Sequence, residues 1–142
     1  MSEHPNATLL REFYEAFSRK DGEAMAAAYQ PDAEFADPAF PDLDGLGAGA
    51  MWRMLTERGA DLKVEFSGIE ADDTHGKAHW EAWYTLSATG KKVHNIIEAE
   101  FEFRDGKISK HTDRFDFYRW SKMAFGLPGV LLGWTPILKN KV

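Results

Sequence analysis

The spacing of apolar residues changes once along this chain, close to Gly59. Before that point apolar residues recur at every third or fourth position, which is the period of one face of an α-helix. After it they alternate with polar residues, which is the period of a β-strand with one buried face. Helices followed by alternating strands predict an α+β fold, with N-terminal helices packed on one face of an antiparallel sheet.

Three helices and a short strand are expected before Gly59. The first helix covers residues 7–18, and the second is capped by Asp21 and carries Tyr29. A short strand at 33–36 follows the second helix, and a turn-rich segment at 42–47 precedes the third. The third helix is expected to bury one stripe, formed by Met51, Met54, Leu55 and Arg58.

Four longer strands are expected after Gly59, separated by turns at 72–76, 89–90 and 105–106. Because side chains alternate between the two faces of a strand, each strand should have one inward row. The inward row of the third of these strands is Val93, Asn95, Ile97, Ala99, Phe101 and Phe103. The inward row of the last strand is His111, Asp113, Phe115 and Phe117.

Composition limits the class of protein. The chain has 142 residues, of which 44% are hydrophobic and 13% aromatic, which suits a single domain, 1–142, with a substantial core. A net charge of −6 without a basic run argues against a nucleic-acid partner. The sequence contains no cysteine, which excludes disulfides and a thiolate nucleophile. No signal peptide or membrane span is recognisable, so a cytoplasmic protein is expected.

The C-terminal segment, residues 120–142, is apolar but interrupted by Pro and Gly. Its longest apolar stretch, at 125–138, is too short and too broken to span a bilayer. We expect this extension to cover the mouth of a pocket or to contact another subunit.

The order of these elements resembles the nuclear transport factor 2-like superfamily. Three stretches are most similar to its SnoaL-like polyketide cyclase and ketosteroid-isomerase-like branch: LLREFYEAFSRKDGEAMAAAYQPDAEF, ADPAF and FEFRDGKISKHTDRFD. The resemblance covers residues 7 to about 120. It implies a curved antiparallel sheet and helices that form a cone-shaped α+β barrel around an apolar pocket, often in a homodimer. Members include isomerases, cyclases, dehydratases, hydrolases and proteins without catalysis, so the fold leaves the function open.

Asp37 lies in the apolar stretch FADPAF, directly before Pro38. In ketosteroid-isomerase-like members the Asp of this Asp-Pro pair is the general base, and the resemblance assigns that role to Asp37. It shares its strand face with Phe35 and should point inward. The hydrogen-bond donors of ketosteroid isomerases fall on Phe13 and near Ala99, which argues against steroid isomerisation. The alternative is an Asp that only shapes the turn before Pro38.

His111 and Asp113 form a second candidate pair. In SnoaL-like cyclases an Asp in the last strand is the acid–base residue, and Asp113 matches that place. The spacing of two puts His111 on the same strand face, and Asn95 on the neighbouring strand could hydrogen-bond the pair or a substrate oxygen. The alternative is a buried structural pair that joins adjacent strands. A metal site formed by Asp37, His111 and Asp113 is the weaker interpretation, and no metal is expected.

The cone is expected to have an aromatic lining formed by Tyr14, Phe17, Trp52, Trp80 and Tyr84. Aromatic residues at this spacing are, however, more often ordinary core than a binding site. GLGAG at 45–49 lacks the Lys and the preceding strand of a phosphate site, so no cofactor is expected.

Two functions remain open. One is an acid–base enzyme, such as an isomerase, cyclase, dehydratase or hydrolase, acting on a small apolar or polycyclic ligand. The other is a non-catalytic binding or dimerisation module. A homodimer is expected through the outward sheet face around Ile96.

Overall fold

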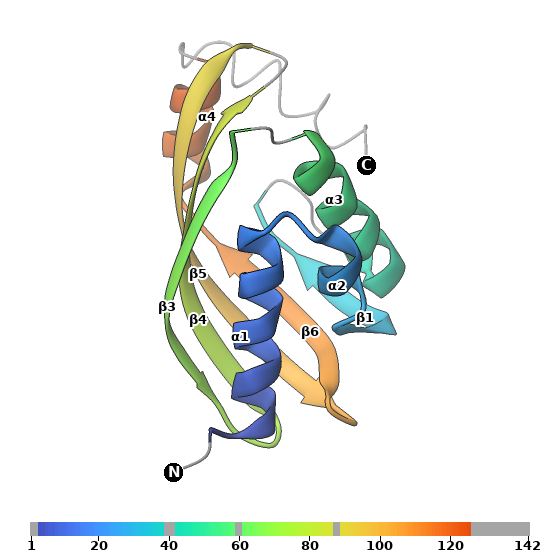
Figure 1. Cartoon of the computed structure of the whole chain (residues 1–142). Coiled ribbons are helices and arrows are strands. Elements are labelled where there is room, and N and C mark those ends of the chain that lie inside the picture. The colour runs from blue at the N-terminus through green and yellow to red at the C-terminus, as the bar shows by residue number, and fades with distance from the viewer. Residues whose placement is uncertain (1–2, 39–41, 59–60, 87–88, 126–142) are drawn as a thin grey trace.

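The computed structural model describes residues 3–38, 42–58, 61–86 and 89–125. Within these ranges the chain forms helices and strands in the expected order, helices first (Figure 1). In chain order the elements are α1 (Pro5–Ser18), α2 (Gly22–Ala26), β1 (Tyr29–Ala36), β2 (Leu43–Asp44), α3 (Gly45–Arg58), β3 (Lys63–Ala71), β4 (His75–Leu86), β5 (Lys91–Arg104), β6 (Lys107–Arg114) and α4 (Phe117–Phe125).

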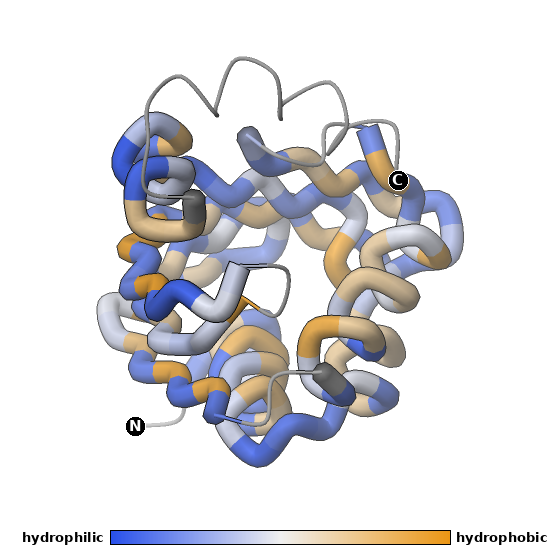
Figure 2. The backbone as a smooth tube through the Cα atoms, turned by 90° about the horizontal axis from the view of Figure 1, so that it is seen from above, coloured by the Kyte–Doolittle hydropathy of each residue, from blue (hydrophilic) through white to orange (hydrophobic). Residues whose placement is uncertain are grey.

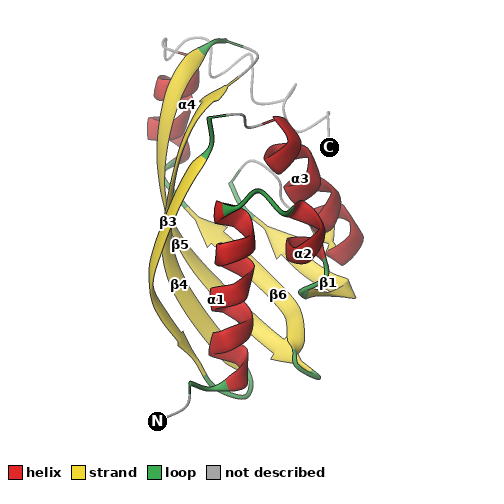
Figure 3. Cartoon of the chain, in the orientation of Figure 1, coloured by secondary structure: helices red, strands yellow, loops and turns green. Residues whose placement is uncertain are grey.

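The strands form one six-stranded sheet in the order β2-β1-β6-β5-β4-β3. All neighbours are antiparallel except β1 and β6, which run parallel. The sheet bends around α1, α2 and α3, which lie on its inner face (Figure 3). It ends at β2 and β3, so it does not close into a barrel. The α+β class and the curved sheet are therefore confirmed, and the two-residue β2 is an element that the sequence did not predict.

The long strands confirm the predicted alternation. Along β5 every second residue from Val93 to Phe103 is buried, and Asn95 belongs to this inward row. Figure 2 looks down on the chain and shows helices and sheet around a shared interior, with hydrophobic segments in orange. That interior is filled largely by aromatic side chains from both layers.

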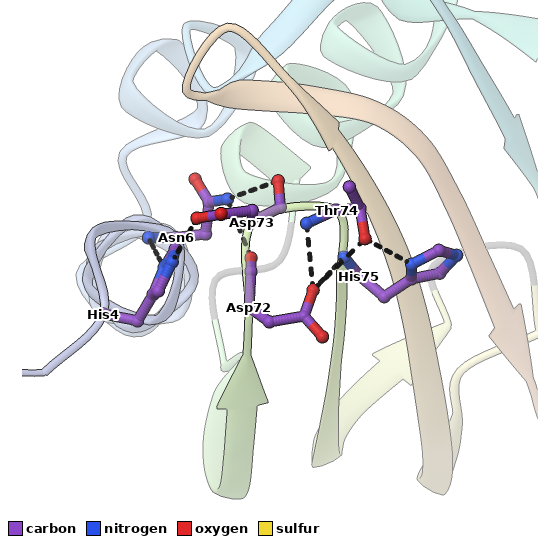
Figure 4. A network of polar contacts seen from close by, with 6 residues as sticks. All are labelled: His4, Asn6, Asp72, Asp73, Thr74 and His75. Atoms are coloured by element: carbon purple, nitrogen blue, oxygen red, sulfur yellow. Dashed lines mark hydrogen bonds and ion pairs between the residues drawn. The ribbon is translucent and has the colours of Figure 1, made fainter.

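The N-terminus of α1 is fixed to the turn between β3 and β4 (Figure 4). The His4 ring accepts a hydrogen bond from the Asn6 backbone at 3.0 Å and contacts the Asp73 carboxylate at 2.8 Å. The buried Asn6 amide donates to the backbone carbonyls of Asp72 and Asp73. These contacts orient α1, and with it the Tyr14 side chain, over the sheet.

The sequence analysis placed Tyr29 in the second helix, and this prediction is wrong. Helix α2 ends at Ala26, and Tyr29 is the first residue of β1, where it pairs with Ile108 of β6. The physical reason is long-range pairing, because the amide of Ile108 also donates to the Ala28 carbonyl at 2.9 Å. Sheet pairing thus overrides the local helical spacing.

The buried face of α3 also differs from the predicted stripe. Trp52 and Thr56 are buried together with Ala48, whereas Met54 is 42% exposed and Met51 and Leu55 are only partly buried. The reason is close helix packing on small residues. A Cβ atom on Gly49 would lie only 2.9 Å from Ala26 Cβ of α2. This approach turns Trp52, rather than the methionines, into the interior.

The last strand is shorter than predicted. It ends at Arg114, and Phe117 is the first residue of α4 instead of an inward strand residue. The Asp116 carboxylate accepts a hydrogen bond from the Arg119 backbone at 3.0 Å, which is the contact of a helix N-cap. Helix α4 buries Trp120 and Ala124 against Val93 of β5. The predicted covering role of the C-terminal extension falls mainly on residues 126–142, which lie outside the described residues.

None of the described helices is both long and apolar enough to cross a membrane.

Candidate functional site

The predicted aromatic lining converges from three elements of the fold. Tyr14 and Phe17 come from α1, Trp52 from α3 and Trp80 from β4, and all four are buried. The Phe17 ring lies 5.1 Å from Trp52 and 5.2 Å from Trp80, measured between ring centroids. The two indoles are 6.1 Å apart. These side chains therefore form one aromatic cluster between the helices and the sheet.

His111 and Asp113 lie inside this aromatic cluster. The alternation of β6 turns both side chains inward, as expected from their spacing. His111 Nε2 is 2.8 Å from Asp113 Oδ1, and the two side chains are 0% and 2% exposed. The structure thus brings the predicted pair together in surroundings from which bulk water is excluded.

Tyr29 is a member of this site that the sequence analysis missed. Its hydroxyl oxygen is 2.7 Å from His111 Nδ1 and accepts a hydrogen bond from Trp52 Nε1 at 2.8 Å. The sequence contained a usable signal, because a residue directly before proline disfavours helical backbone. Gln30 precedes Pro31, so the helical pattern is expected to end by Gln30, which puts Tyr29 at the boundary of that pattern.

Asp113 has one oxygen in hydrogen bonds and one without. Oδ1 faces His111 Nε2 and also accepts from Trp80 Nε1 at 3.4 Å. Within the described part of the chain, Oδ2 accepts no hydrogen bond. A carboxylate can accept at both oxygens, so Oδ2 is the unused half of a buried acid.

The Tyr14 hydroxyl is a second polar group without a partner. It is fully buried and makes no hydrogen bond within the described residues. Burial raises the pKa of the Tyr14 hydroxyl well above its ordinary value, and the nearby negative charge of Asp113 raises it further. Tyr14 therefore keeps its proton at neutral pH and lies within electrostatic reach of Asp113.

Asn95 faces inward but does not join the His111–Asp113 pair. It is buried on β5, and among the described residues no hydrogen bond links its side chain to His111 or Asp113. Asp113 pairs with Ala99, four residues farther along β5, which corresponds to roughly 13 Å of strand. Asn95 instead pairs with Ala82 of β4, close to Tyr84.

Asp37 and Tyr84 belong to a second polar region, near α4. Burial raises the pKa of Tyr84, a hydrogen bond from Trp120 Nε1 at 2.7 Å opposes that shift, and the charge of Asp37 adds to it. Asp37 is partly buried. It follows Ala36, whose strand partner Thr112 precedes Asp113, so the two acids are close in the backbone. The two acids affect different tyrosines: the charge of Asp37 raises the pKa of Tyr84, whereas the charge of Asp113 raises the pKa values of Tyr14 and Tyr29.

Two surface hollows are formed by described residues. One, of about 540 Å³, lies between the turn that joins β3 to β4 and the neighbouring parts of β5 and β6. It is lined by charged side chains such as Glu100 and Lys110. The other, of about 430 Å³, lies between β1, β2 and β6 and includes Phe35 and His111 in its wall. None of the predicted aromatic lining residues borders either hollow. Within the described ranges, no three His, Asp or Glu side chains are arranged to hold a metal ion.

Known proteins share this architecture. An LEH-like epoxide hydrolase from M. tuberculosis superposes with a TM-score of 0.70 at 20% identity, covering 91% of this chain and 96% of its own. IdmH, a candidate polyketide cyclase from Streptomyces antibioticus, gives 0.69 at 21% identity and 87% and 100% coverage. TerC, crystallised with polyporic acid, gives 0.70 at 16% identity and 84% and 98% coverage.

At these identities the structural matches show a common fold. Comparison with curated protein sequences gives no match. The sequence pattern of the SnoaL-like domain, however, matches residues 10–111, which is more than half of the chain. This match covers the segments that carry Tyr14, Tyr29, Trp52 and His111. The chain therefore belongs to the SnoaL-like domain family.

Proposed function

We propose that this protein is an enzyme that transfers a proton on a small apolar carbonyl compound, with Asp113 as the general base. One observation carries the proposal. Within the described residues, the buried Tyr14 hydroxyl makes no hydrogen bond, and the hydrogen bonds of Asp113 use only Oδ1, inside a cluster of aromatic rings. Buried polar groups are usually satisfied, so an unpartnered hydroxyl that feels the charge of Asp113 supports a place for a ligand.

The chemistry that suits this pair is enolisation. Asp113 Oδ1 is held by His111 and Trp80, which leaves Oδ2 to take a proton from the carbon next to a carbonyl. The electron pair of the broken C–H bond moves to the carbonyl oxygen. Tyr14, kept protonated by its raised pKa, donates a hydrogen bond to the enolate oxygen that forms. Return of the proton from Asp113 to a different carbon gives an isomer. Alternatively, the enolate carbon attacks a second carbonyl and closes a ring, the C=O π electrons move to that oxygen, and the resulting alkoxide takes the proton from Asp113.

The surroundings favour an apolar, polycyclic substrate. Phe17, Trp52 and Trp80 offer aromatic surface but few polar contacts. The candidate cyclase IdmH and TerC with polyporic acid share this fold and support a ligand of that kind.

Asp37, Asn95 and Tyr84 are proposed to contact the part of the substrate nearer α4, with Asp37 as a second acid–base group. His111 supports Asp113, and proton transfer by these side chains requires no cofactor.

A second function is favoured by a different observation. Both ring nitrogens of His111 have partners, and the Asp113 side chain is only 2% exposed. A substrate reaches Asp113 only when a neighbouring ring moves. If the rings stay in place, His111 and Asp113 serve as a structural pair between strands in a non-catalytic binding module.

Hydrogen–deuterium exchange of a model ketone distinguishes the two functions. The probe is 2-tetralone, a bicyclic ketone, in D₂O at neutral pH, with loss of its α-proton signals followed by NMR. We expect the wild-type protein to accelerate exchange above the buffer rate. Asp113→Asn keeps the shape but removes the base, so the acceleration should fall by about 10²–10⁴-fold.

The matched control is Asp105→Asn, because Asp105 is an exposed carboxylate in the turn between β5 and β6, outside the site, and asparagine also accepts its positive φ of 54°. This variant should accelerate exchange of the ketone α-protons as much as the wild type does. Exchange at the buffer rate with the wild-type protein, for 2-tetralone and for one-ring and three-ring ketones alike, would contradict the enzyme and favour the binding module.

A further inference from the structure

The buried hydrogen-bond chain around His111 ends in an indole at each side. Trp52 Nε1 contacts the Tyr29 hydroxyl at 2.8 Å, and Trp80 Nε1 contacts Asp113 Oδ1 at 3.4 Å. An indole N–H can donate a hydrogen bond but cannot accept one. The two ends therefore fix the direction of donation in the groups between them.

The direction can be followed from Trp52 to Tyr29. The Tyr29 oxygen accepts the indole N–H, and the Tyr29 proton remains to be placed. Burial raises the pKa of the Tyr29 hydroxyl well above its ordinary value; the hydrogen bond from Trp52 lowers it, and the charge of Asp113 raises it. Tyr29 thus keeps its proton. Within the described residues, the acceptor left for this proton is His111 Nδ1, at 2.7 Å.

This placement determines the protonation of the His111 ring. If Nδ1 accepts from Tyr29, the ring proton is on Nε2, where it is donated to Asp113 Oδ1 at 2.8 Å. The opposite arrangement, with a proton on Nδ1, would leave the Tyr29 proton buried without an acceptor in the described structure. Leaving a buried donor without a partner is unfavourable, so the first arrangement is favoured.

The ring of His111 is also held in orientation by its neighbours. It stacks on Tyr29 and on Trp52 at interplanar angles of 16° and 17°. Phe35 and Phe101 pack against it with centroids 5.0 Å and 4.3 Å away. Since the ring is enclosed on these sides, the position of its proton decides what it offers to Asp113.

We propose that Tyr29 is a positioning residue whose hydroxyl holds His111 in the Nε2–H tautomer. In this tautomer the ring donates to Asp113 Oδ1 and leaves Oδ2 for a ligand. Tyr29 touches His111 and not the substrate, so it acts through His111. The consequence for catalysis rests on the proposed function, whereas the tautomer is a property of the resting protein.

The tautomer can be measured by ¹⁵N NMR on the full-length protein labelled at histidine. Long-range ¹H–¹⁵N correlation distinguishes a protonated from an unprotonated ring nitrogen. For wild-type His111 we expect one tautomer, with protonated Nε2 and unprotonated Nδ1. In Tyr29→Phe the ring that stacks on His111 is kept and the donor is lost. The Nδ1 signal should then shift markedly, towards an average of protonated and unprotonated forms.

Tyr84→Phe is the matched control for this signal. Tyr84 is a partly buried tyrosine that also accepts an indole N–H, but its partner is Trp120, and among the described residues no hydrogen bond or ring contact joins it to His111. Its substitution should leave the His111 nitrogen signals in place. In the ketone assay, Tyr29→Phe should reduce kcat more than it changes KM, because Tyr29 does not contact the substrate.

Two results would overturn the proposal. One is a wild-type His111 that is protonated on Nδ1, a measurement that does not depend on any variant folding. The other is an unchanged Nδ1 signal in Tyr29→Phe. A correct tautomer without ketone exchange in the wild type would contradict the proposed enzyme but leave the role of Tyr29 on His111 intact.

Discussion

The two buried tyrosines next to Asp113 differ in their hydrogen bonds. Tyr29 has a partner on each side of its hydroxyl, whereas Tyr14 has none within the described structure. Both have a raised pKa, chiefly because of burial. The Tyr29 hydroxyl therefore stabilises the folded protein without a ligand. The Tyr14 hydroxyl destabilises it, because its buried O–H has no acceptor until a carbonyl oxygen binds there.

This difference predicts opposite effects of two phenylalanine substitutions on stability. Tyr14→Phe removes a buried hydroxyl without a partner, so the free energy of unfolding should stay the same or rise by up to about 2 kcal/mol. Tyr29→Phe leaves the Trp52 N–H without its acceptor, so the free energy of unfolding should fall by about 1–3 kcal/mol. Urea denaturation measures both. A Tyr14→Phe protein that loses as much stability as Tyr29→Phe would show that the Tyr14 hydroxyl already has a partner.

At the scale of elements, the sequence predicted best where the pattern is local. The alternation along β5 and β6 was visible in the sequence and correctly turned Asn95, His111 and Asp113 inward. The stripe of α3 was not predicted correctly, because helix contact at Gly49 selects the buried face and large apolar residues do not mark it. Phe117 was misplaced because the Asp116 cap ends the strand pattern early.

In the candidate site, too, local spacing could be predicted from the sequence, whereas long-range contacts could not. The His111–Asp113 pair follows from a spacing of two on one strand and could be predicted. The contacts with Tyr29 and Trp80 could not, since 82 residues separate Tyr29 from His111 and 33 separate Trp80 from Asp113. Such contacts depend on which strands and helices meet in the fold.

Strands β4 and β5 carry a histidine–glutamate network on their outer face. His79 Nε2 lies 2.9 Å from a Glu81 oxygen, and His79 Nδ1 lies 2.5 Å from a Glu98 oxygen. The second Glu81 oxygen contacts His94 Nε2 at 2.7 Å. The contacts of His79 with Glu98 and of His94 with Glu81 join the two strands.

This network predicts a pH-dependent contribution to stability. The hydrogen bond with Glu81, followed by that with Glu98, raises the pKa of His79 above its ordinary value of about 6.5. The folded state thus holds the His79 proton more tightly than the unfolded state. The resulting stabilisation is fully present below about pH 6.5 and is lost as the pH rises through the folded-state pKa.

Urea denaturation of the wild type and of His79→Gln at pH 5.5 and pH 9 tests this contribution. The difference in unfolding free energy between the two proteins should be larger at pH 5.5. Glu98→Gln should reduce the difference by removing one of the two carboxylates. An equal difference at both pH values would show that the His79 proton is not linked to folding.

At the scale of the whole molecule, the helices α1 to α3 cover the inner face of the sheet (Figure 1). On the outer face Ile96 is 40% exposed in the middle of β5. Along the outward row of β5 a basic residue lies on one side of Ile96 and acidic residues on the other. They are Lys92 before Ile96, and Glu98, Glu100 and Glu102 after it.

This distribution suits a homodimer with two-fold symmetry around Ile96. Rotation by 180° would bring the basic end of one β5 over the acidic part of the other, and the two Ile96 side chains together at the axis. Ile96→Asp should therefore turn a dimer into a monomer of 16.1 kDa in light scattering at micromolar concentration. Leu46→Asp is the matched control, because Leu46 is 69% exposed but lies on α3, away from this face, so its dimer should persist. A wild-type protein that scatters as a monomer would contradict the dimer, and an Ile96→Asp protein that remains dimeric would place its interface on another surface.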